Sequence, residues 1–303
     1  MNTCMECIPC FIRQTLDVLD LTDADEPTRR TVLRAVLREM AEAEFDESPP
    51  ALARRVHRVI RESIGCEDPY RAIKAECNEL ALTLYDDLRQ AVLKSDDPLA
   101  AACRLAIVGN VIDYGVQSHS PLEGIREVIH EAMDTPIDPA AVDRLRREAV
   151  WAERILYLAD NAGEIVLDRL LLEQLPAEKV TLVVRGGPIL NDALREDARS
   201  VGISEMVRVM DNADNAPGTL LEHCSPELRD EFRRADLVIA KGQGNFESLC
   251  GVRDKDHLLF LFRLKCPVVC DALGAQQGQP MIVWRDDLPG DGIQAGRSKP
   301  TVA

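Results

Sequence analysis

The sequence predicts an α/β fold, with a three-layer α/β/α domain built on a mostly parallel sheet and an N-terminal all-helical domain. After Trp151, short apolar runs alternate with helix-length segments, which is typical of a parallel sheet covered by helices on both faces. Before it, apolar residues recur at three- and four-residue spacing, which is typical of amphipathic helices. We therefore expect a helical domain over residues 1–150 and an α/β domain over residues 151–284.

The first half shows helical periodicity without a convincing strand pattern. Pro49-Pro50 and Asp68-Pro69 mark turns between its helices. The periodic positions include Ile12, Leu16, Leu19, Leu33, Leu37, Met40, Ile73, Leu80 and Leu84.

The second half contains six short apolar runs of strand length. The predicted strands cover residues 155–159, 180–184, 207–210, 237–240, 258–262 and 267–270. Predicted helices cover residues 163–174, 192–200 and 225–234. Residues 285–303, rich in Gly, Pro and charge, are predicted to form a flexible tail.

The charge composition of the chain bears on whether it binds nucleic acid. The chain has 303 residues, of which 36 are basic and 52 acidic, for a formal net charge of −16. Such a surface repels the phosphate backbone, so no nucleic-acid partner is expected. A bound divalent cation can still reverse the local field for a small anionic substrate.

The sequence also predicts a compartment. The first residues lack a basic region followed by an apolar run, and no apolar stretch approaches the roughly 18 residues that span a bilayer. We therefore expect a cytoplasmic protein with no membrane partner, whose 10 cysteines are reduced. The sequence sets no oligomeric state.

Polar loops follow the first three predicted strands. The first loop contains Asp160 and Asn161, the second Asp192, and the third Asp211 and Asp214. The carboxyl ends of parallel strands share one edge, so these loops are expected to converge there. Carboxylate and amide oxygens suit a hard cation such as Mg²⁺ or Mn²⁺. Taken singly, each residue is equally suited to capping the helix that follows it.

A glycine-containing loop, residues 241–245, follows the fourth predicted strand. It has the composition of an anion cradle, because glycines let backbone N–H groups approach a phosphate; a plain turn is the alternative. Lys265 is suited to neutralising a phosphoryl oxygen, with a surface lysine as the alternative. No Gly-rich fingerprint follows the first strand, so neither a dinucleotide nor adenosylmethionine is expected.

These loops resemble those of the damage-control phosphatases, a family once catalogued as a domain of unknown function. The similar stretches are Asp160-Asn161-Ala162-Gly163-Glu164, Leu190-Asn191-Asp192, Lys241-Gly242-Gln243-Gly244-Asn245-Phe246-Glu247 and Lys265-Cys266-Pro267. The first half adds Cys7-Ile8-Pro9-Cys10, Asp68-Pro69-Tyr70 with Lys74, and Gly109-Asn110-Val111-Ile112-Asp113. The similar stretches occur in the same order as in the family, over roughly residues 4–284. The Cys-x-x-Cys pair resembles that of the stand-alone prokaryotic subgroup of the family.

The resemblance implies a metal-dependent hydrolase of small phosphorylated metabolites, such as sugar phosphates, nucleotides or damaged cofactor intermediates. It implies that a divalent metal (Mn, Co, Ni or Mg) binds the catalytic residues Asp160, Asn161 and Asp192. It also favours Asp192 over Asp211 and Asp214, which are equally suitable by chemistry alone. The implied substrate- and phosphate-binding residues are Asn110, Asp113, Gly242, Gly244, Asn245, Glu247 and Lys265.

The reaction we infer is metal-assisted phosphoryl transfer, with an activated water as the nucleophile. Direct attack by a carboxylate such as Asp192 is the alternative route. The competing function is a non-catalytic phosphometabolite-binding protein, which would need the same loops.

Cys4, Cys7 and Cys10 are spaced by three near the N-terminus. They are interpreted in three ways: a helix start packed through small thiols, a second metal site, or a redox pair. A structural metal site normally needs four ligands, and no second Cys-x-x-Cys completes one.

Overall fold

Six strands form one sheet in the computed structural model, which describes residues 1–109, 129, 133–253 and 255–289. Their order is β3-β2-β1-β4-β5-β6, with β6 antiparallel to β5 and every other neighbouring pair parallel. The direction of chain winding reverses between β1 and β4, where open parallel sheets bind ligands. The strands are β1 Ile155–Leu158, β2 Val180–Val184, β3 Arg208–Asp211, β4 Leu237–Lys241, β5 Leu258–Arg263 and β6 Pro280–Trp284.

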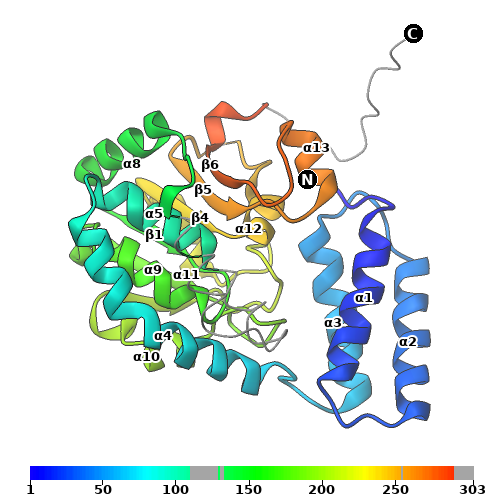
Figure 1. The fold of residues 1–303 in the computed structure, drawn as a ribbon. Coiled ribbons are helices and arrows are strands. Elements are labelled where there is room, and N and C mark those ends of the chain that lie inside the picture. Colours follow the sequence, from blue (N-terminus) through cyan, green and yellow to red (C-terminus); the bar gives the residue numbers. More distant parts are fainter. Residues whose placement is uncertain (110–128, 130–132, 254, 290–303) are drawn as a thin grey trace.

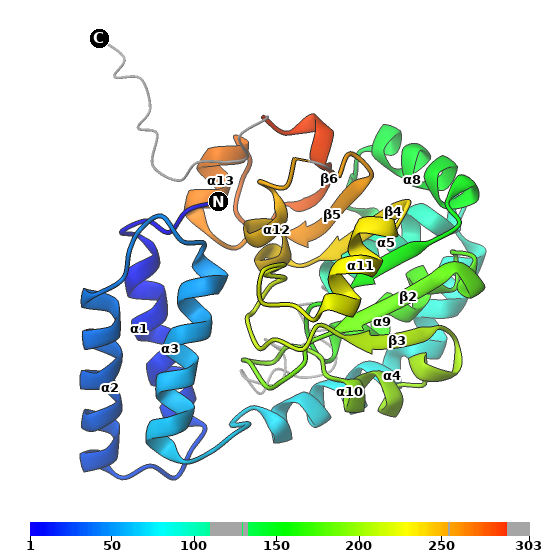
Figure 2. The ribbon, with the colours of Figure 1, turned by 180° about the vertical axis from the view of Figure 1, so that it is seen from behind.

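Helices cover both faces of this sheet. In β1, Ile155 and Tyr157 enter one apolar core, whereas Leu156 and Leu158 enter the other, as the two-residue period of a strand requires. Helices α4, α5, α8, α9 and α10 cover the first face, and α11, α12 and α13 cover the second (Figures 1 and 2). The predicted three-layer α/β/α arrangement is therefore confirmed. The covering helices are α4 Arg71–Lys94, α5 Pro98–Val108, α8 Pro139–Trp151, α9 Glu164–Leu172, α10 Arg195–Ser200, α11 Pro226–Arg234, α12 Gln243–Leu249 and α13 Pro267–Leu273.

Three further helices form a separate bundle beside this α/β body (Figure 1). The bundle has its own apolar core, in which Val32, Leu52 and Ile60 are fully buried. Its last helix ends at Gly65, whose φ of 66° is a left-handed conformation that favours glycine. The bundle helices are α1 Cys7–Asp20, α2 Glu26–Ala41 and α3 Pro49–Ile64. Short 3-10 turns occur at Ala177–Lys179, Ile203–Glu205 and Arg285–Asp287.

The structure differs from the division expected at residue 150. Helices α4, α5 and α8 precede that residue, yet their apolar faces share one core with the sheet. A sheet of buried strands needs helices on both faces, whereas helical periodicity shows only that some face of a helix is buried. The structural boundary therefore lies between α3 and α4.

The predicted strand over residues 267–270 is wrong. These residues belong to α13, which has Cys266 as its N-cap and Pro267 in its first turn, a position that suits proline. The sixth strand is instead β6, which the sequence analysis missed. The predicted tail does not begin at residue 285. Arg285 is buried, and its Nε donates to the Val252 carbonyl at 2.8 Å. The rest of the predicted tail, residues 290–303, lies outside the described residues.

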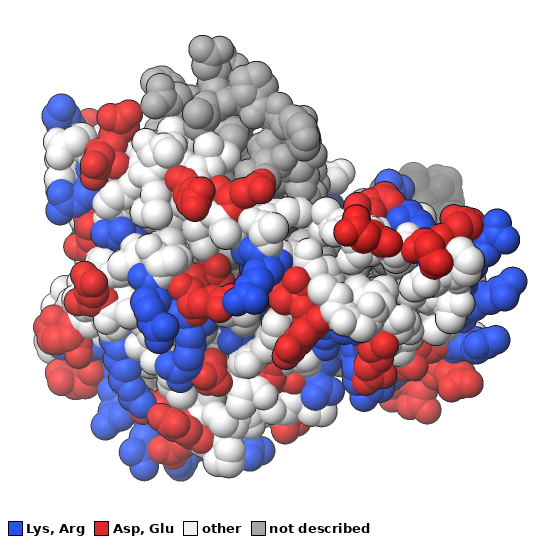
Figure 3. Space-filling model, turned by 90° about the horizontal axis from the view of Figure 1, so that it is seen from below, with Lys and Arg blue, Asp and Glu red and all other residues white. Residues whose placement is uncertain are grey.

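Two surface properties bear on partners. No helix in the described part of the chain is long and apolar enough to cross a membrane. On the face shown in Figure 3, acidic and basic side chains are interspersed, so the net charge of −16 is not gathered into one acidic patch there.

Candidate functional site

The loops after β1 and β2 are joined by backbone hydrogen bonds. The Ala162 N–H donates to the Asn191 carbonyl at 2.9 Å, and the Ala193 N–H donates to the Asp160 carbonyl at 2.8 Å. These bonds form an antiparallel bridge between Asn161 and Asp192. The structure therefore brings together Asp160, Asn161 and Asp192, the three predicted metal ligands.

The capping alternative fails for all three residues. Helix α9 has Gly163 as its N-cap and no side-chain cap. The Asn161 side chain instead donates from Nδ2 to Asp160 Oδ2 at 2.8 Å and to Glu164 Oε2 at 3.0 Å. Helix α10 begins at Arg195, too far along the chain for Asp192 to be its cap.

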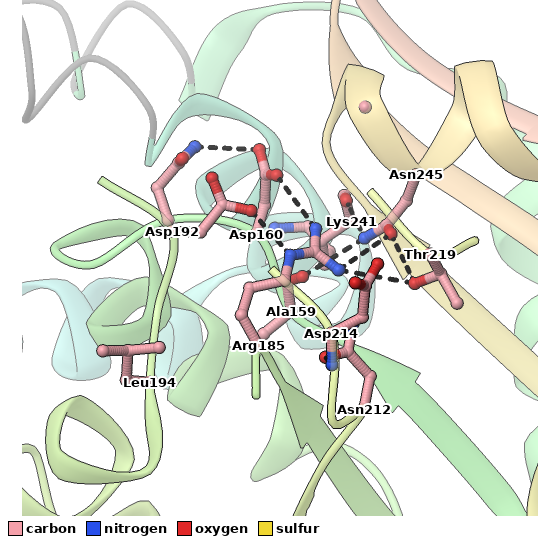
Figure 4. A network of polar contacts seen from close by, with 12 residues as sticks. Ala159, Asp160, Arg185, Asp192, Leu194, Asn212, Asp214, Thr219, Lys241 and Asn245 are labelled. Atoms are coloured by element: carbon pink, nitrogen blue, oxygen red, sulfur yellow. Dashed lines mark hydrogen bonds and ion pairs between the residues drawn. The ribbon is translucent and has the colours of Figure 1, made fainter. Parts of the chain in front are cut away.

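A buried arginine that the sequence analysis missed lies beside these carboxylates (Figure 4). Arg185 follows β2 directly, and its Nε donates to Asp192 Oδ2 at 2.6 Å. Its Nη2 is 3.8 Å from Asp160 Oδ1. Arg185 is only 3% exposed, so its charge acts with little solvent screening. Its position after a strand, in the loop that leads to Asp192, was the available signal.

Asn245, a predicted phosphate ligand, braces this arginine. Its Oδ1 accepts from Arg185 Nη1 at 3.3 Å and from Thr219 Oγ1 at 2.8 Å (Figure 4). Its Nδ2 donates to the carbonyls of Lys241 and Ala159, at 2.7 Å and 3.2 Å. The amide thus ties the ends of β1 and β4 to Arg185, and its buried polar atoms are paired inside the protein.

The two predicted cradle glycines allow close packing. Gly242 has a φ of +81°, and a Cβ there would lie 2.0 Å from Asp160 Oδ2. A Cβ on Gly244 would lie 2.0 Å from the Pro217 carbonyl oxygen. The Gly242 N–H already donates to the Leu261 carbonyl at 3.0 Å. In this structure, the missing side chain of Gly242 therefore lets Asp160 lie close to the backbone, and its N–H group is not part of an anion cradle.

The other two predicted contacts lie on different sides of the site. Lys265 is exposed, and its positive charge partly opposes the rise in the pKa of Asp160 that burial causes. Glu247 instead accepts from Gln243 Nε2 at 2.7 Å. Its backbone carbonyl accepts from the N-terminal ammonium of Met1 at 3.0 Å. Glu247 thus lies where α12 meets the N-terminal segment.

The site carries an excess of buried negative charge. Asp160, whose side chain is 12% exposed, and three buried carboxylates, Glu164, Asp168 and Asp192, share it with two buried cations, Arg185 and Lys241. A third buried cation, Lys74, is matched by its ion pair with Asp68 at 2.7 Å. Burial, followed by the charges of Glu164 and Asp192, raises the pKa of Asp160 well above its usual range.

This donor set fits a divalent metal. When ionised, Asp160, Glu164, Asp168 and Asp192 exceed the charge of Arg185 and Lys241 by two negative charges, which is the charge that a divalent cation neutralises. The available donors are two carboxylates and one amide, which suit hard cations such as Mg²⁺ and Mn²⁺. Across the described ranges, no three His, Cys, Asp or Glu side chains form a metal-binding group. Two carboxylates plus an amide fall outside that pattern.

Two predicted pocket residues, Asn110 and Asp113, lie outside the described residues. The last described residue before them, Gly109, packs directly on Glu164. A Cβ on Gly109 would lie 2.9 Å from Glu164 Cγ and 3.1 Å from its Cα. The end of α5 is therefore in contact with the residue that bonds Asn161.

The N-terminal cysteines lie outside this site. Cys4 Sγ and Cys7 Sγ are 3.5 Å apart, without a disulfide. Burial raises the pKa of Cys7 to about 12, which favours a neutral thiol. Cys10 is exposed on α1, where Gln14 Nε2 is 3.6 Å from its sulfur. The bound-metal and redox interpretations of this group stay predictions.

Comparison with known proteins gives a consistent family. The model of the damage-control phosphatase ARMT1-like domain matches residues 3–281. A damage-control phosphatase from Archaeoglobus fulgidus is 36% identical over 231 residues, covering 75% of this chain and 79% of that protein. Another from Pyrococcus horikoshii is 31% identical over 282 residues, covering 92% of this chain and 96% of that protein.

A solved structure agrees with these relatives. The crystal structure of a DUF89 family protein from Pyrococcus horikoshii matches with a TM-score of 0.85 at 29% identity. The match covers 94% of this chain and 99% of that chain. The resemblance found in the sequence is confirmed, and this chain belongs to the ARMT1-like damage-control phosphatase family.

Proposed function

We propose that this protein is a metal-dependent phosphatase that hydrolyses phosphate monoesters of small metabolites in the cytoplasm. The class of substrate is sugar phosphates, nucleotides or damaged cofactor intermediates. The observation that carries the proposal is the bridge between Asn161 and Asp192, which gathers three oxygen donors in a region of excess negative charge. Family membership supports the phosphatase class.

In this proposal, Asp160, Asn161 and Asp192 hold a divalent cation, Mn²⁺, Co²⁺, Ni²⁺ or Mg²⁺. When bound, such a cation supplies positive charge that stabilises the transferring phosphoryl group. Arg185 holds Asp192 from the interior at 2.6 Å. We assign to Lys265, which is exposed and whose charge acts on Asp160, the neutralisation of a phosphoryl oxygen.

We favour water over Asp192 as the nucleophile. Asp192 is 2% exposed, and its Oδ2 accepts a charge-assisted bond from Arg185. A carboxylate held in this way loses nucleophilicity and freedom to reach phosphorus. In the resulting reaction, the water oxygen bonds to phosphorus and the ester P–O bond breaks. A proton given up by the water ends on the leaving oxygen, so the metabolite leaves as an alcohol and inorganic phosphate is formed.

Phosphate release from a panel of sugar phosphates and nucleotides tests the proposal, with each metal compared against a chelator. We expect Asp160→Ala to abolish metal-dependent hydrolysis while the circular dichroism spectrum stays unchanged. Asp211→Ala is the matched control, because Asp211 also ends a strand but pairs with Arg195 Nε at 2.5 Å. The control should keep activity.

Two results would count against this function. Full activity in Asp160→Ala would remove Asp160 from the site. Tight binding of panel members by the wild-type protein without any phosphate release would establish the alternative, a non-catalytic phosphometabolite-binding protein.

A further inference from the structure

A chain of buried polar side chains runs inward from Asn161. Glu164 accepts from Asn161 Nδ2 through Oε2, at 3.0 Å, and from Lys241 Nζ through Oε1, at 2.6 Å. Lys241 Nζ also donates to Asp168 Oδ1 at 2.6 Å, and the Tyr157 hydroxyl donates to the same oxygen at 2.8 Å. Glu164, Lys241, Asp168 and Tyr157 are each at most 2% exposed.

This chain decides which way the Asn161 amide faces. An asparagine side chain presents an oxygen on one side and an NH₂ group on the other. A carboxylate paired with a lysine, as Glu164 is with Lys241, only accepts hydrogen bonds, so Glu164 requires the NH₂ group of Asn161. The amide oxygen therefore faces away from Glu164, which leaves it available as a metal ligand.

Lys241 holds Glu164 in place for this task. Its ammonium compensates the buried charges of Glu164 and Asp168, which would otherwise carry a large desolvation penalty. Its third bond, at 2.6 Å, goes to the Ala106 carbonyl near the end of α5. The same α5 end places Gly109 against Glu164, so Glu164 is fixed by an ion pair on one side and by backbone on the other.

We propose that Lys241 is a positioning residue for the metal site, acting through Glu164 on the orientation of the Asn161 amide. The inference rests on the proposed function, because it assumes that Asn161 is a metal ligand. It also assigns Lys241 an interior role, although its loop has the composition of an anion cradle.

The test is calorimetric titration of the full chain with Mn²⁺ alone, in the absence of substrate. Glu164→Gln is the principal variant, because it keeps the shape of the side chain and leaves Lys241 paired with Asp168. A glutamine can offer either oxygen or NH₂ to Asn161, so the amide loses its fixed orientation. We expect the Kd for Mn²⁺ to rise at least tenfold, with little change in Tm.

Lys241→Met is the direct variant and should weaken Mn²⁺ binding by a similar factor if it folds. Tyr157→Phe is the matched control, because it removes the far end of the chain and leaves the Glu164–Lys241 contact intact. Its Kd for Mn²⁺ should stay within twofold of the wild-type value. As a second readout, saturating Mn²⁺ should restore much of the kcat of Glu164→Gln, which a purely structural defect would not allow.

The outcomes separate the two proposals. If the wild-type protein binds no divalent metal, the proposed function fails and this inference fails with it. If the wild-type protein binds Mn²⁺ and Glu164→Gln binds it within twofold, the positioning role is overturned while the proposed function stands. Equal weakening in Glu164→Gln and Tyr157→Phe would also overturn it, because the effect would then be general to the buried chain.

Discussion

The strand-end region of the body and the core of the α1–α3 bundle are held together by opposite kinds of interaction. Near Asp160, the cations Arg185 and Lys241 are buried, and each forms an ion pair with a buried carboxylate. In the bundle, the buried core is almost entirely apolar, and charged groups such as Arg55 pair at the half-exposed rim. Buried ion pairs add little net stability, whereas buried apolar area adds much.

The difference indicates what each region is for. The bundle is organised for stability, because an apolar core needs no exact partner for each atom. The body holds charged side chains with little exposure at the edge where open parallel sheets bind ligands. Each of them carries a desolvation penalty that its hydrogen-bond partners must offset. The two regions meet through α3, where Arg54 Nε is 2.6 Å from Asp214 Oδ1 and Arg61 Nη1 donates to the Pro188 carbonyl at 3.1 Å.

Arg185→Met is expected to have the largest effect of the substitutions in the body. Removing the guanidinium leaves Asp192 buried without its cation, which typically costs about 3–5 kcal/mol of unfolding free energy. We also expect metal binding to be lost, because Asp192 and Asn245 both lose the group that orients them. Urea unfolding and Mn²⁺ titration measure the two effects.

Leu52→Ala in the bundle is the counterpart. Leu52 is fully buried, so truncation should cost about 2–5 kcal/mol through the cavity it leaves. Mn²⁺ affinity should not change, because no charged group of the site is altered. A loss of metal affinity in Leu52→Ala equal to that in Arg185→Met would contradict the division of roles between the two regions.

Two glycines show the same difference between the body and the bundle. Gly242 in the body and Gly65 in the bundle both have positive φ, at +81° and +66°. A Cβ on Gly65 has nothing within 4 Å, whereas a Cβ on Gly242 would lie 2.0 Å from Asp160 Oδ2. Gly65→Ala should therefore cost only backbone strain, about 1 kcal/mol. Gly242→Ala should cost about 3–4 kcal/mol, from strain and displacement of Asp160, and should abolish activity.

Thermal unfolding and phosphate release under the same buffer conditions compare these two variants. Equal stability losses, or an active Gly242→Ala, would show that Asp160 is not held against the backbone at Gly242.

Much of the fold could be predicted from local patterns. The first five strands follow from short apolar runs, because a buried parallel strand is apolar on both faces. Residues 267–270 are equally apolar but begin a helix at Pro267, and such a short run does not distinguish the two states. The covering role of α4, α5 and α8 also escaped prediction, because periodicity does not name the partner of a helix.

The site shows the same limit. Position after a strand drew attention to Asp160 and Asn161 but left Asp192, Asp211 and Asp214 equally suitable. The choice of Asp192 came from the resemblance to the damage-control phosphatases. The roles of Arg185, Asn245 and Lys241 depend on partners that are distant in sequence. Arg185 and Asn245, for example, are 60 positions apart. The composition of the loop at residues 241–245 predicted an anion cradle. Gly242 instead packs against Asp160 and Asn245 accepts from Arg185, and no local sequence pattern predicts these contacts.

The smallest expected effect on the site comes from Glu247→Gln, at the seam between α12 and the N-terminal segment. Burial raises the pKa of Glu247 from an ordinary value of 4.5 to about 7, although the Gln243 hydrogen bond and the N-terminal ammonium lower it. The folded protein therefore binds a proton that the unfolded chain has lost between about pH 4.5 and pH 7. Stability from this group must then fall as the pH rises through that window.

Glutamine mimics the protonated form, so the variant should match the wild-type stability near pH 4.5 and exceed it by about 3 kcal/mol at pH 8. Urea unfolding at pH 4.5, 6, 7 and 8 measures the difference. The thiols of Cys7 and Cys10 feel the charge of Glu247, but burial raises the pKa of each above its ordinary value of 9.0, so both stay protonated across this pH range in both proteins. A stability difference that does not depend on pH would mean that Glu247 ionises freely at the seam. Unchanged Mn²⁺ affinity in the variant would show that Glu247 does not belong to the proposed metal site. We expect this result because the metal is proposed to bind the carboxylates around Asp160.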